Sequence, residues 1–491
     1  MAEALLIYPY LGDMDIIRSK PYAPLPLVQA ASKLALHYQT KILDVRIERS
    51  WQEGLEHELE KGPFYVALSV MTGKPIVSAL EISSFVKQRC NIPVVWGGHH
   101  PTMCPDLTLS DPAVDVVVIG EGEDTLLELT DRYSSGRNLE GVKGLWFKRN
   151  GHFIQNEPRP ALDLNLLPPT PFHLLDVGQY IYEYGGKTFI NIETSRGCNH
   201  RCRYCYHTSG NGHHHFRAMN PDKTIEHIAN SIKSCRTDGV FIVDDNFFVD
   251  KIRGMDTARK IMDQDCRMPW LVGGMDVPTM LSMTSKELNL LEKSNLNRIS
   301  VGAETGSQKT LTKIRKPQTI DMLIKANRIW SQVDIKIYYS WMAGFPGETI
   351  DDVKQTVDIM LKIIKENSRA RTSPIYNFIP LPGTELWNEV IENYGFCPPD
   401  SLEQWAKCDA SHVNVPYMEA SMKKTLNNLY FPSLFMDKKF EDYGVPAWLA
   451  LAARAYRPVA RARMRSKFYH FPIEKWAGEK AELFFPRRRR S

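Results

Sequence analysis

The sequence predicts an α/β protein of 491 residues that carries two parallel-sheet domains in tandem. Two observations lead to this fold class. Short apolar, β-branched runs alternate with stretches of helical periodicity, which is typical of parallel sheets covered by helices. A proline-rich stretch then divides the alternation into two series. We therefore predict a doubly wound domain (1–150), a linker (151–185), a (β/α)6 partial barrel (186–395) and a mostly helical C-terminal capping region with a basic tail (396–491).

The first series begins with a fully apolar run at residues 4–8, which predicts a buried strand. Later runs predict strands at 41–45, 65–70, 93–96 and 114–119, and helices at 25–37, 76–87 and 124–133. Strands that alternate with helices in this way form a doubly wound parallel sheet. Ligands of such sheets bind beyond the carboxyl ends of the strands.

Small and turn-forming residues follow the strands of this first series. Glycine allows a large flat ligand to approach the backbone closely. One Gly-Gly or Gly-x-Gly is usually only a turn, so the prediction depends on the whole set. The candidates for ligand contact are Gly12, Thr72, Gly73, Gly97, Gly98, Gly120, Glu121 and Gly122.

Five prolines between residues 158 and 171 exclude a regular helix or a central strand in the linker. Beyond it, apolar runs predict six strands, at 187–193, 240–243, 270–273, 298–302, 335–341 and 373–379. Helical patterns separate them, at 221–235, 255–265, 286–293, 320–332 and 350–366. Six β/α units form a barrel that is open on one side, and active sites of such barrels lie at the carboxyl ends of the strands.

Three cysteines stand in one loop just after the first strand of the barrel. Cys198, Cys202 and Cys205 have the spacing Cys-x-x-x-Cys-x-x-Cys, so one loop can present three thiolates to one metal centre. Three thiolates leave one position of a four-iron cluster open for a ligand. The alternative is a structural zinc site, which needs a fourth ligand that His200 or His207 could supply. Histidines 213–215 could also bind a metal, although a solvated loop explains them as well.

Carboxylates follow two other predicted strands of the barrel. Asp244 and Asp245 follow the second strand, and Glu304 follows the fourth. Carboxylates at strand ends can bind cationic or hydroxyl-bearing groups through charge-assisted hydrogen bonds. The alternative for each is a helix cap or a first-turn charge.

The cysteine loop resembles that of the radical S-adenosylmethionine (SAM) enzymes, including Tyr204 before the last cysteine. Residues 302–307 (Gly-x-Glu-Thr-Gly-Ser), 344–349 (Gly-Phe-Pro-Gly-Glu-Thr) and 380–384 (Pro-Leu-Pro-Gly-Thr) follow in the order of that superfamily. The resemblance implies a 4Fe–4S cluster on the three cysteines, whose fourth iron binds SAM. It also implies that the cluster cleaves SAM to a 5′-deoxyadenosyl radical. Tyr204, Asp244, Asp245 and Glu304 are then the expected SAM-binding residues.

The first domain resembles the Rossmann-like cobalamin-binding domain that precedes the radical domain in one large class of these enzymes. Residues 95–102 (Val-Trp-Gly-Gly-His-His-Pro-Thr) and 119–123 (Ile-Gly-Glu-Gly-Glu) carry this resemblance. It implies that the strand-end candidates bind cobalamin. The Asp-x-His-x-x-Gly motif that supplies a histidine to cobalt elsewhere is absent, so we expect no histidine on cobalt. A bond from His99 or His100, and a domain that no longer binds cobalamin, are the alternatives.

Together the two resemblances imply a cobalamin-dependent radical SAM methyltransferase that methylates an unactivated carbon. The alternative is a cobalamin-dependent cyclase or rearrangement enzyme, similar to the anaerobic magnesium-protoporphyrin ester cyclases. A cluster- or zinc-bearing binding module is the non-catalytic alternative. The expected partners are a small-molecule substrate and an electron donor such as flavodoxin or ferredoxin.

Composition narrows the other partners and the compartment. A net charge of +4 gives no indication of nucleic-acid binding. Nine cysteines, an odd number, favour reduced thiols and a cytoplasmic location. No run of eighteen apolar residues predicts a membrane-spanning helix. The arginines at 461, 463, 465 and 487–490 are typical of a solvated arm, but could contact a membrane surface or an anionic substrate.

Overall fold

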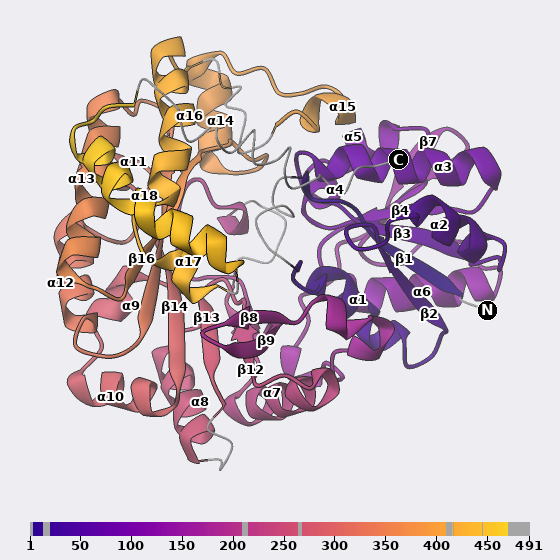
Figure 1. Cartoon of the computed structure of the whole chain (residues 1–491). Helices are drawn as coiled ribbons and strands as arrows, with labels where there is room; N and C mark the ends of the chain where they lie inside the picture. Colours follow the sequence, from indigo (N-terminus) through magenta and orange to yellow (C-terminus); the bar gives the residue numbers. More distant parts are fainter. Residues whose placement is uncertain are drawn as a thin grey trace.

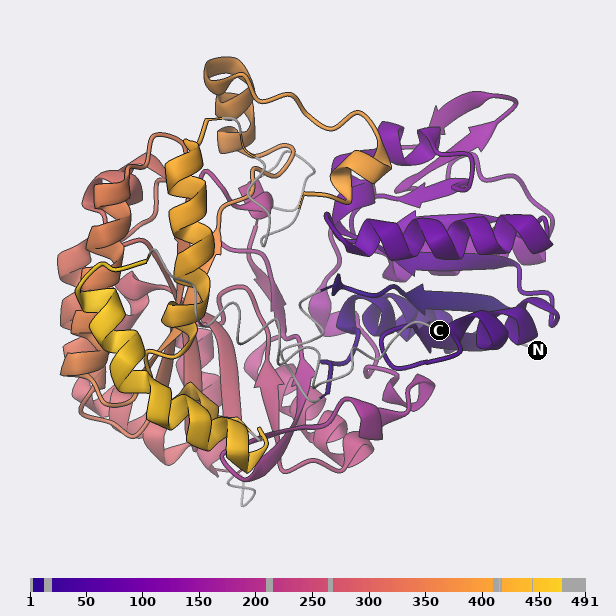
Figure 2. The same cartoon turned by 45° about the horizontal axis from the view of Figure 1, so that its top comes forward.

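The computed structural model describes residues 3–12, 20–208, 215–263, 268–408, 415, 417–443 and 445–469. An N-terminal α/β domain lies beside a larger, helix-covered sheet, and C-terminal helices cover part of the latter (Figures 1 and 2). His213, His214 and the arginines at 487–490 lie outside the described residues.

The first sheet has the strand order β2-β1-β3-β4-β5-β6-β7. Its five parallel strands confirm the predicted ones: β1 (Ala4–Tyr8), β2 (Thr40–Asp44), β3 (Tyr65–Ser69), β4 (Val94–Gly97) and β5 (Val116–Val118). The predicted helices correspond to α1 (Leu25–Leu34), α3 (Pro75–Arg89) and α6 (Glu123–Ser134). Three further helices were not predicted: α2 (Trp51–Leu59), α4 (His99–Met103) and α5 (Pro105–Ser110).

An antiparallel hairpin extends this sheet at one edge. β6 (Leu145–Arg149) pairs with β5, and β7 (His152–Gln155) pairs with β6, so the first sheet continues to Gln155. The sequence predicted that residues from 151 onward, which include β7, belong to the linker.

Both faces of the first sheet are apolar, as a doubly wound fold requires. Along β1, Leu5 and Ile7 pack in one buried cluster, whereas Ala4 and Leu6 pack in another. Successive side chains of a strand point to opposite faces, so helices cover both sides of the sheet. The strand ends therefore remain as the place for a ligand.

The second sheet has the order β16-β15-β14-β13-β12-β9-β8. Six consecutive strands pair in parallel, as predicted: β9 (Lys187–Ile192), β12 (Gly239–Ile242), β13 (Trp270–Met275), β14 (Leu296–Glu304), β15 (Lys336–Ala343) and β16 (Ala370–Asn377). The short strand β8 (Tyr182–Tyr184) adds an antiparallel edge next to β9. The intervening helices are α7 (Pro221–Cys235), α8 (Lys251–Asp263), α9 (Val277–Leu281), α10 (Ser285–Lys293), α11 (Gln308–Lys313), α12 (Ile320–Trp330) and α13 (Ile350–Glu366).

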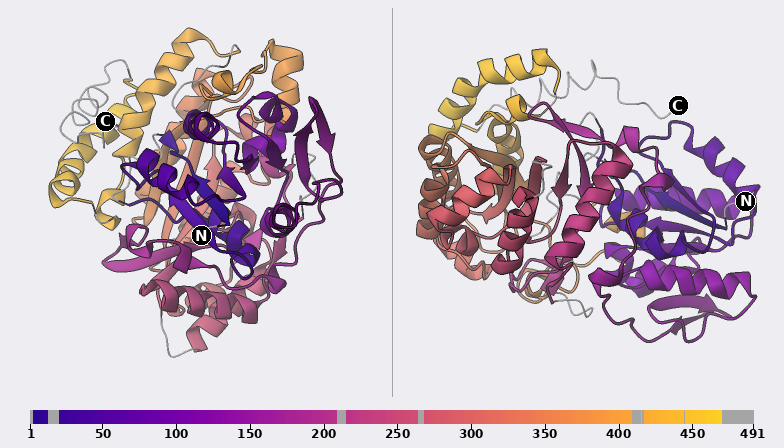
Figure 3. Two further views of the ribbon diagram at one scale, coloured as in Figure 1. Left: turned by 90° about the vertical axis from the view of Figure 1, so that its right-hand side faces the viewer. Right: turned by 90° about the horizontal axis from the view of Figure 1, so that it is seen from below.

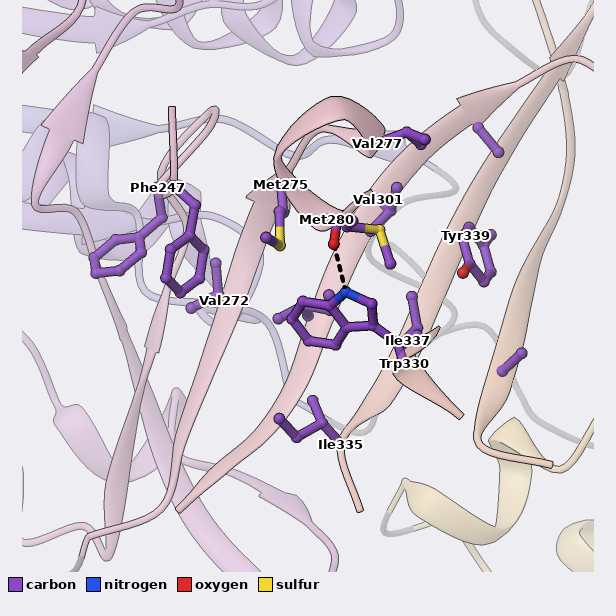
Figure 4. Close-up of a cluster of buried hydrophobic side chains, with 14 of the residues drawn as sticks. Phe247, Val272, Met275, Val277, Met280, Val301, Trp330, Ile335, Ile337 and Tyr339 are labelled. Atoms are coloured by element: carbon purple, nitrogen blue, oxygen red, sulfur yellow. Dashed lines mark hydrogen bonds between the residues drawn. The ribbon is translucent and has the colours of Figure 1, made fainter. Parts of the chain in front are cut away.

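Apolar side chains fill the layer between this sheet and its helices (Figure 4). Trp330 of α12 is fully buried, and its indole Nε1 donates a hydrogen bond of 3.0 Å to the carbonyl of Met280. Val272 of β13 and both Ile337 and Tyr339 of β15 pack in the same cluster. Burying each such side chain contributes about 1.5–3 kcal/mol, so the strands that carry the loops of the site are firmly held.

The C-terminal region contacts both edges of the open barrel. Its helices are α14 (Glu385–Tyr394), α15 (Leu402–Trp405), α16 (Ala420–Leu434), α17 (Lys439–Asp442) and α18 (Ala447–Arg465). Asp442 pairs with Arg371 of β16 at 2.6 Å, and Tyr443 forms a β-bridge with Tyr184 of β8. Helix α18 continues through Pro458, a residue that usually ends a helix, to Arg465. None of the described helices is long and apolar enough to cross a membrane.

Candidate cofactor site between the two domains

The cysteine loop begins where β9 ends, at the carboxyl edge of the barrel. Its first residues form β10 (Ser195–Arg196), which pairs with β11 (Arg217–Ala218) across the loop. Cys202 is buried, whereas Cys198 and Cys205 are half-buried, and none of the three forms a disulfide. The structure thus confirms that one loop at a strand end presents the three thiols.

Burial gives these thiols unusual acid–base properties. It raises the pKa of Cys205 to about 12 and also raises the pKa of Cys202, against the opposing charge of Lys316. Thiolates at these positions therefore need a nearby positive charge, which iron ions supply. In the described residues no three His, Cys, Asp or Glu side chains converge on a place for a single metal ion. A cluster needs no such convergence, because separate thiolates bind separate irons.

Asp244 and Asp245 hold the cysteine loop against the end of β12. Asp244 is 2 % exposed and accepts hydrogen bonds from the backbone N–H of Thr194 at 2.6 Å and the hydroxyl of Ser195 at 2.5 Å. Asp245 accepts from the backbone N–H of Gly197 at 3.1 Å and lies 2.8 Å from Nε2 of His207. The structure therefore gives both carboxylates a positioning role, and their expected contact with SAM stays a prediction.

A polar chain also reaches the sulfur of Cys198. Asn246 Nδ2 lies 3.8 Å from Cys198 Sγ and 2.8 Å from Asp276 Oδ2. Asp276 in turn lies 3.3 Å from His200 Nε2. Burial alone would raise the pKa of Asp276, but hydrogen bonds from His200, Asn246 and Thr279 lower it to about 2. Neither Asn246 nor Asp276 was among the residues expected from the sequence.

Glu304 ends β14 with a backbone φ of 63°, and its side chain is not a helix cap. Its carboxylate forms a buried ion pair of 2.9 Å with Lys316, whose Nζ lies 3.4 Å from the hydroxyl of Tyr204. Burial alone would lower the pKa of Lys316, but the charges of Glu304, Tyr204 and Cys202 hold it well above its usual range. Glu304 thus lies near the cysteine loop, as expected, and the chain itself already balances its charge.

Aromatic rings form a wall behind the cysteine loop. Phe345 stacks on Phe378 with ring centroids 4.9 Å apart and contacts Tyr204 edge-on at 5.8 Å. Glu348 shapes this loop, because its carboxylate accepts hydrogen bonds from the backbone N–H groups of Gly344 and Phe345, at 2.5 Å and 3.2 Å. Phe345 and Phe378 are buried, so they support this loop from behind, and its contact with adenine stays a prediction.

The strand-end candidates of the first domain lie along the carboxyl edge of its sheet, after β1, β3, β4 and β5. Gly98 has a φ of 99°, and a Cβ there would lie 2.9 Å from the carbonyl of Val70, so the fold itself requires this glycine. Gly12, Gly73 and Gly120 also have positive φ, whereas Gly97 and Gly122 do not. Thr72 contributes its hydroxyl, 3.2 Å from Nδ1 of His100. Contact of these residues with cobalamin stays a prediction.

Glu121 has a different surrounding from the other candidates. Its carboxylate lies 2.8 Å from Arg196 and 2.9 Å from Arg217, both in the barrel domain. Arg196 also pairs with Glu123 at 2.6 Å and with Glu193 at 2.7 Å. Burial alone would raise the pKa of Glu121, but the two arginines lower this pKa to about 2, so the carboxylate stays ionised. Glu121 therefore joins the two domains, and a cobalamin contact would be additional.

His99 brings the two strand-end edges together. Its ring lies 4.4 Å from that of Tyr206 in the cysteine loop, measured between centroids. Although part of the His99 side chain is accessible to solvent, many protein atoms surround its ring. The resulting desolvation, together with the charge of His207, lowers the pKa of His99. His99 therefore contacts the cysteine loop from the strand-end edge of the first domain. His100 points elsewhere: it is fully buried, contacts Trp405, and burial lowers its pKa to about 4.

Comparisons with known proteins agree with both halves of this site. Residues 192–360 match the model of the radical SAM superfamily, and residues 21–130 match that of the B12 binding domain. An uncharacterized methyltransferase of Pyrococcus horikoshii is 27 % identical over 374 residues, which cover 75 % of this chain and 79 % of the relative. The anaerobic magnesium-protoporphyrin IX monomethyl ester cyclase of Synechocystis is 29 % identical, over 55 % of this chain and 53 % of its own length.

Solved structures share the two-domain fold. The cobalamin-dependent SAM radical enzyme OxsB superposes with a TM-score of 0.73 at 15 % identity, covering 94 % of this chain and 72 % of that one. The radical SAM methyltransferase TsrM of Kitasatospora setae gives 0.64 at 20 % identity, over 80 % and 75 % of the two chains. The fold and the site thus define a two-domain cofactor enzyme. The chain thus combines a radical SAM domain with an N-terminal B12-binding domain, and the cofactors of these two domains are a 4Fe–4S cluster, SAM and cobalamin.

Proposed function

We propose that this protein is a cobalamin-dependent radical SAM methyltransferase that methylates an unactivated carbon of a small molecule. The observation that carries the proposal is the meeting of two strand-end edges. The cysteine loop of the barrel and the glycine-bearing edge of the B12-binding domain touch through Tyr206 and His99, 4.4 Å apart. A substrate bound where these two edges meet would lie between both cofactor sites.

The residues of this chain have separate tasks in that reaction. Cys198, Cys202 and Cys205 hold the cluster, while Asp244 and Asp245 fix the path of their loop. The buried rings of Phe345 and Phe378 support the loop after β15 from behind. When bound, the cluster supplies an electron that cleaves SAM, and cobalamin supplies the methyl group.

The contacts between the domains help to exclude water from the place where the two strand-end edges meet. Arg196 holds the domains together at their strand ends through Glu121 and Glu123, and α15 packs on the other side against α3. Reactive intermediates survive only where water and side reactions are kept away. The interface is therefore part of the catalytic arrangement.

A cyclase or rearrangement enzyme is the second candidate. Its support is the 29 % identity to the cyclase of Synechocystis, which extends over 281 residues. The two functions differ in what the product contains, since methyl transfer adds one carbon and cyclisation adds none.

The test is an anaerobic incubation of the reconstituted enzyme with candidate substrates and SAM that carries a deuterated methyl group. We expect a product that is heavier by one labelled methyl group, and no such product from the variant in which Cys198, Cys202 and Cys205 are alanine. A product without the label, formed together with 5′-deoxyadenosine, would favour the cyclase instead.

We further propose that a one-electron donor such as flavodoxin or ferredoxin serves the cluster, in a reducing cytoplasm. None of the described cysteines outside the loop forms a disulfide, which suits such an environment. Reduction of the reconstituted cluster by flavodoxin, followed at its visible absorbance, tests the first part.

A further inference from the structure

Helix α18 carries a stripe of apolar side chains on the surface of the molecule. Trp448, Leu451 and Val459 are 53 %, 67 % and 50 % exposed. Ala452, Ala455 and Ala462 are exposed as well. These six residues, called the α18 stripe below, recur every three or four positions, so they lie on one face of the helix.

The opposite face of α18 already packs against the protein. Ala453, Ala460 and Met464 are buried there, and the helix contacts α16 and α13. Figure 3 shows α18 on the outer surface of the barrel domain. Leu451 and Val459 nevertheless remain largely exposed on the face that points outward. Contiguous exposed apolar surface marks a site of interaction.

The charged residues of the helix itself are all basic. Residues 447–469 contain five arginines and one lysine but no Asp or Glu. Arg454 and Arg465 are exposed on one flank of the stripe, and Arg461 is half-exposed beside them. Glu441 balances Arg457 and Asp358 balances Lys467, but no acidic residue of the helix itself offsets the flank. A partner of this face must combine apolar surface with negative charge.

We propose that α18 binds the surface of a membrane that contains anionic lipids, with the α18 stripe in the interfacial layer. An amphipathic helix with arginines beside an apolar face has the properties of an interfacial helix. Tryptophan at one end suits the boundary between head groups and acyl chains.

The experiment is sedimentation of the reconstituted full-length protein with phosphatidylcholine vesicles, with or without phosphatidylglycerol. We expect binding to the anionic vesicles that weakens with salt. The double variant Leu451→Glu/Val459→Glu should lower the binding constant about tenfold or more, because it places charge in the apolar layer. Leu36→Glu is the matched control, since Leu36 is also 67 % exposed but lies elsewhere, and it should bind like the wild type.

Two further variants separate the stripe from other basic residues. Arg454→Glu should weaken binding to anionic vesicles. In a protein whose four arginines at 487–490 are replaced by serine, the Leu451→Glu/Val459→Glu change should still weaken binding. Retention of cluster absorbance shows that each variant is folded. The proposal is overturned if the double variant binds vesicles as the wild type does, or if neither vesicle binds. A dimer in analytical ultracentrifugation that Leu451→Glu dissociates would assign the stripe to a second copy of the chain instead.

Discussion

Asn246 is the residue whose contact bears most directly on the chemistry of the cluster. Its amide donates to Cys198 Sγ and to the carboxylate of Asp276. Because the pKa of Asp276 is low, its carboxylate is ionised and can only accept hydrogen bonds. It therefore holds the NH2 group of the Asn246 amide, and not the carbonyl, on the side of the sulfur. Hydrogen bonds to cluster sulfurs stabilise the more negative, reduced state.

Asn246→Ala should therefore make the reduction potential of the cluster more negative. One hydrogen bond contributes about 1 kcal/mol, which for one electron corresponds to a shift on the order of tens of millivolts. The measurement is a redox titration followed by electron paramagnetic resonance. Asn327→Ala, a buried asparagine of α12 that bonds to Tyr339, is the control and should leave the potential unchanged. An unshifted potential in Asn246→Ala would remove this role.

The buried pair of Glu304 and Lys316 gives a second prediction at the residue scale. Glu304→Gln keeps the shape but leaves the Lys316 charge uncompensated, which should destabilise the barrel domain by about 3–5 kcal/mol. Adding Lys316→Met should recover most of the loss, as measured by chemical denaturation. If Glu304 also holds SAM, affinity in anaerobic calorimetry should fall about tenfold or more in Glu304→Gln. Unchanged stability and unchanged affinity would contradict both roles.

The roles of single residues were the part least open to prediction. Periodicity placed Glu304 correctly at a strand end beside the cysteine loop. Nothing local showed that Lys316, which follows α11, would return to neutralise it. Likewise Asp244 and Asp245 were found at a strand end, but their partners Thr194 and Gly197 lie about fifty residues earlier in the chain.

At the scale of elements, strands with strong apolar runs were predicted within a few residues of their ends. β14 extends to Glu304 instead of Gly302, and β12 begins one residue early, at Gly239. The β6–β7 hairpin was missed because it directly precedes the prolines of the linker, although Leu145 and Phe147 alternate with more exposed residues. The course of helix α18 was not open to prediction, because Pro458 usually ends a helix, whereas here Ala460 and Met464 beyond it are buried.

The loop between β15 and α13 predicts a pH dependence of stability. Burial raises the pKa of Glu348 to about 7, against the hydrogen bonds from Gly344 and Phe345. A carboxyl whose pKa is higher in the folded than in the unfolded protein binds more protons when folded. Its ionisation therefore costs stability as pH rises from about 4.5 to about 7, by up to about 3 kcal/mol.

Glu348→Gln removes this ionisation and keeps an acceptor for both N–H groups. The variant should match the wild type near pH 5 and be the more stable of the two at pH 8, in denaturation midpoints measured across that range. Asp351→Asn, an exposed residue in the first turn of α13, is the control. Parallel stability curves for Glu348→Gln and the wild type would contradict the prediction.

At the scale of the whole molecule, the interface between the domains is what the sequence could not show. Arg196 contacts Gln29, Glu121 and Glu123, which precede it by 167, 75 and 73 residues. No pattern in either segment indicates such a pairing. The two domains could each be predicted, but the way in which their strand ends face one another could not.

Arg196→Met should loosen this interface, because it leaves the carboxylates of Glu121, Glu123 and Glu193 without their common partner. Breaking a buried ion pair on one side costs about 3–5 kcal/mol. We expect faster amide hydrogen exchange at residues 21–30 and 119–125, where the first domain meets the loop. Arg328→Met removes an exposed pair with Glu366 and should change neither segment. Unaltered exchange in Arg196→Met would mean that other contacts hold the domains.

The central claim is that the cluster and cobalamin share one space between the two domains. The most direct test is electron paramagnetic resonance of the anaerobic holoprotein, with the cluster reduced and cobalamin in its cobalt(II) form, so that each carries an unpaired electron. The account predicts a dipolar interaction between the two spins, and its loss together with the cluster signal when Cys198, Cys202 and Cys205 are alanine. Two full signals without any interaction would place the cofactors far apart and contradict the account.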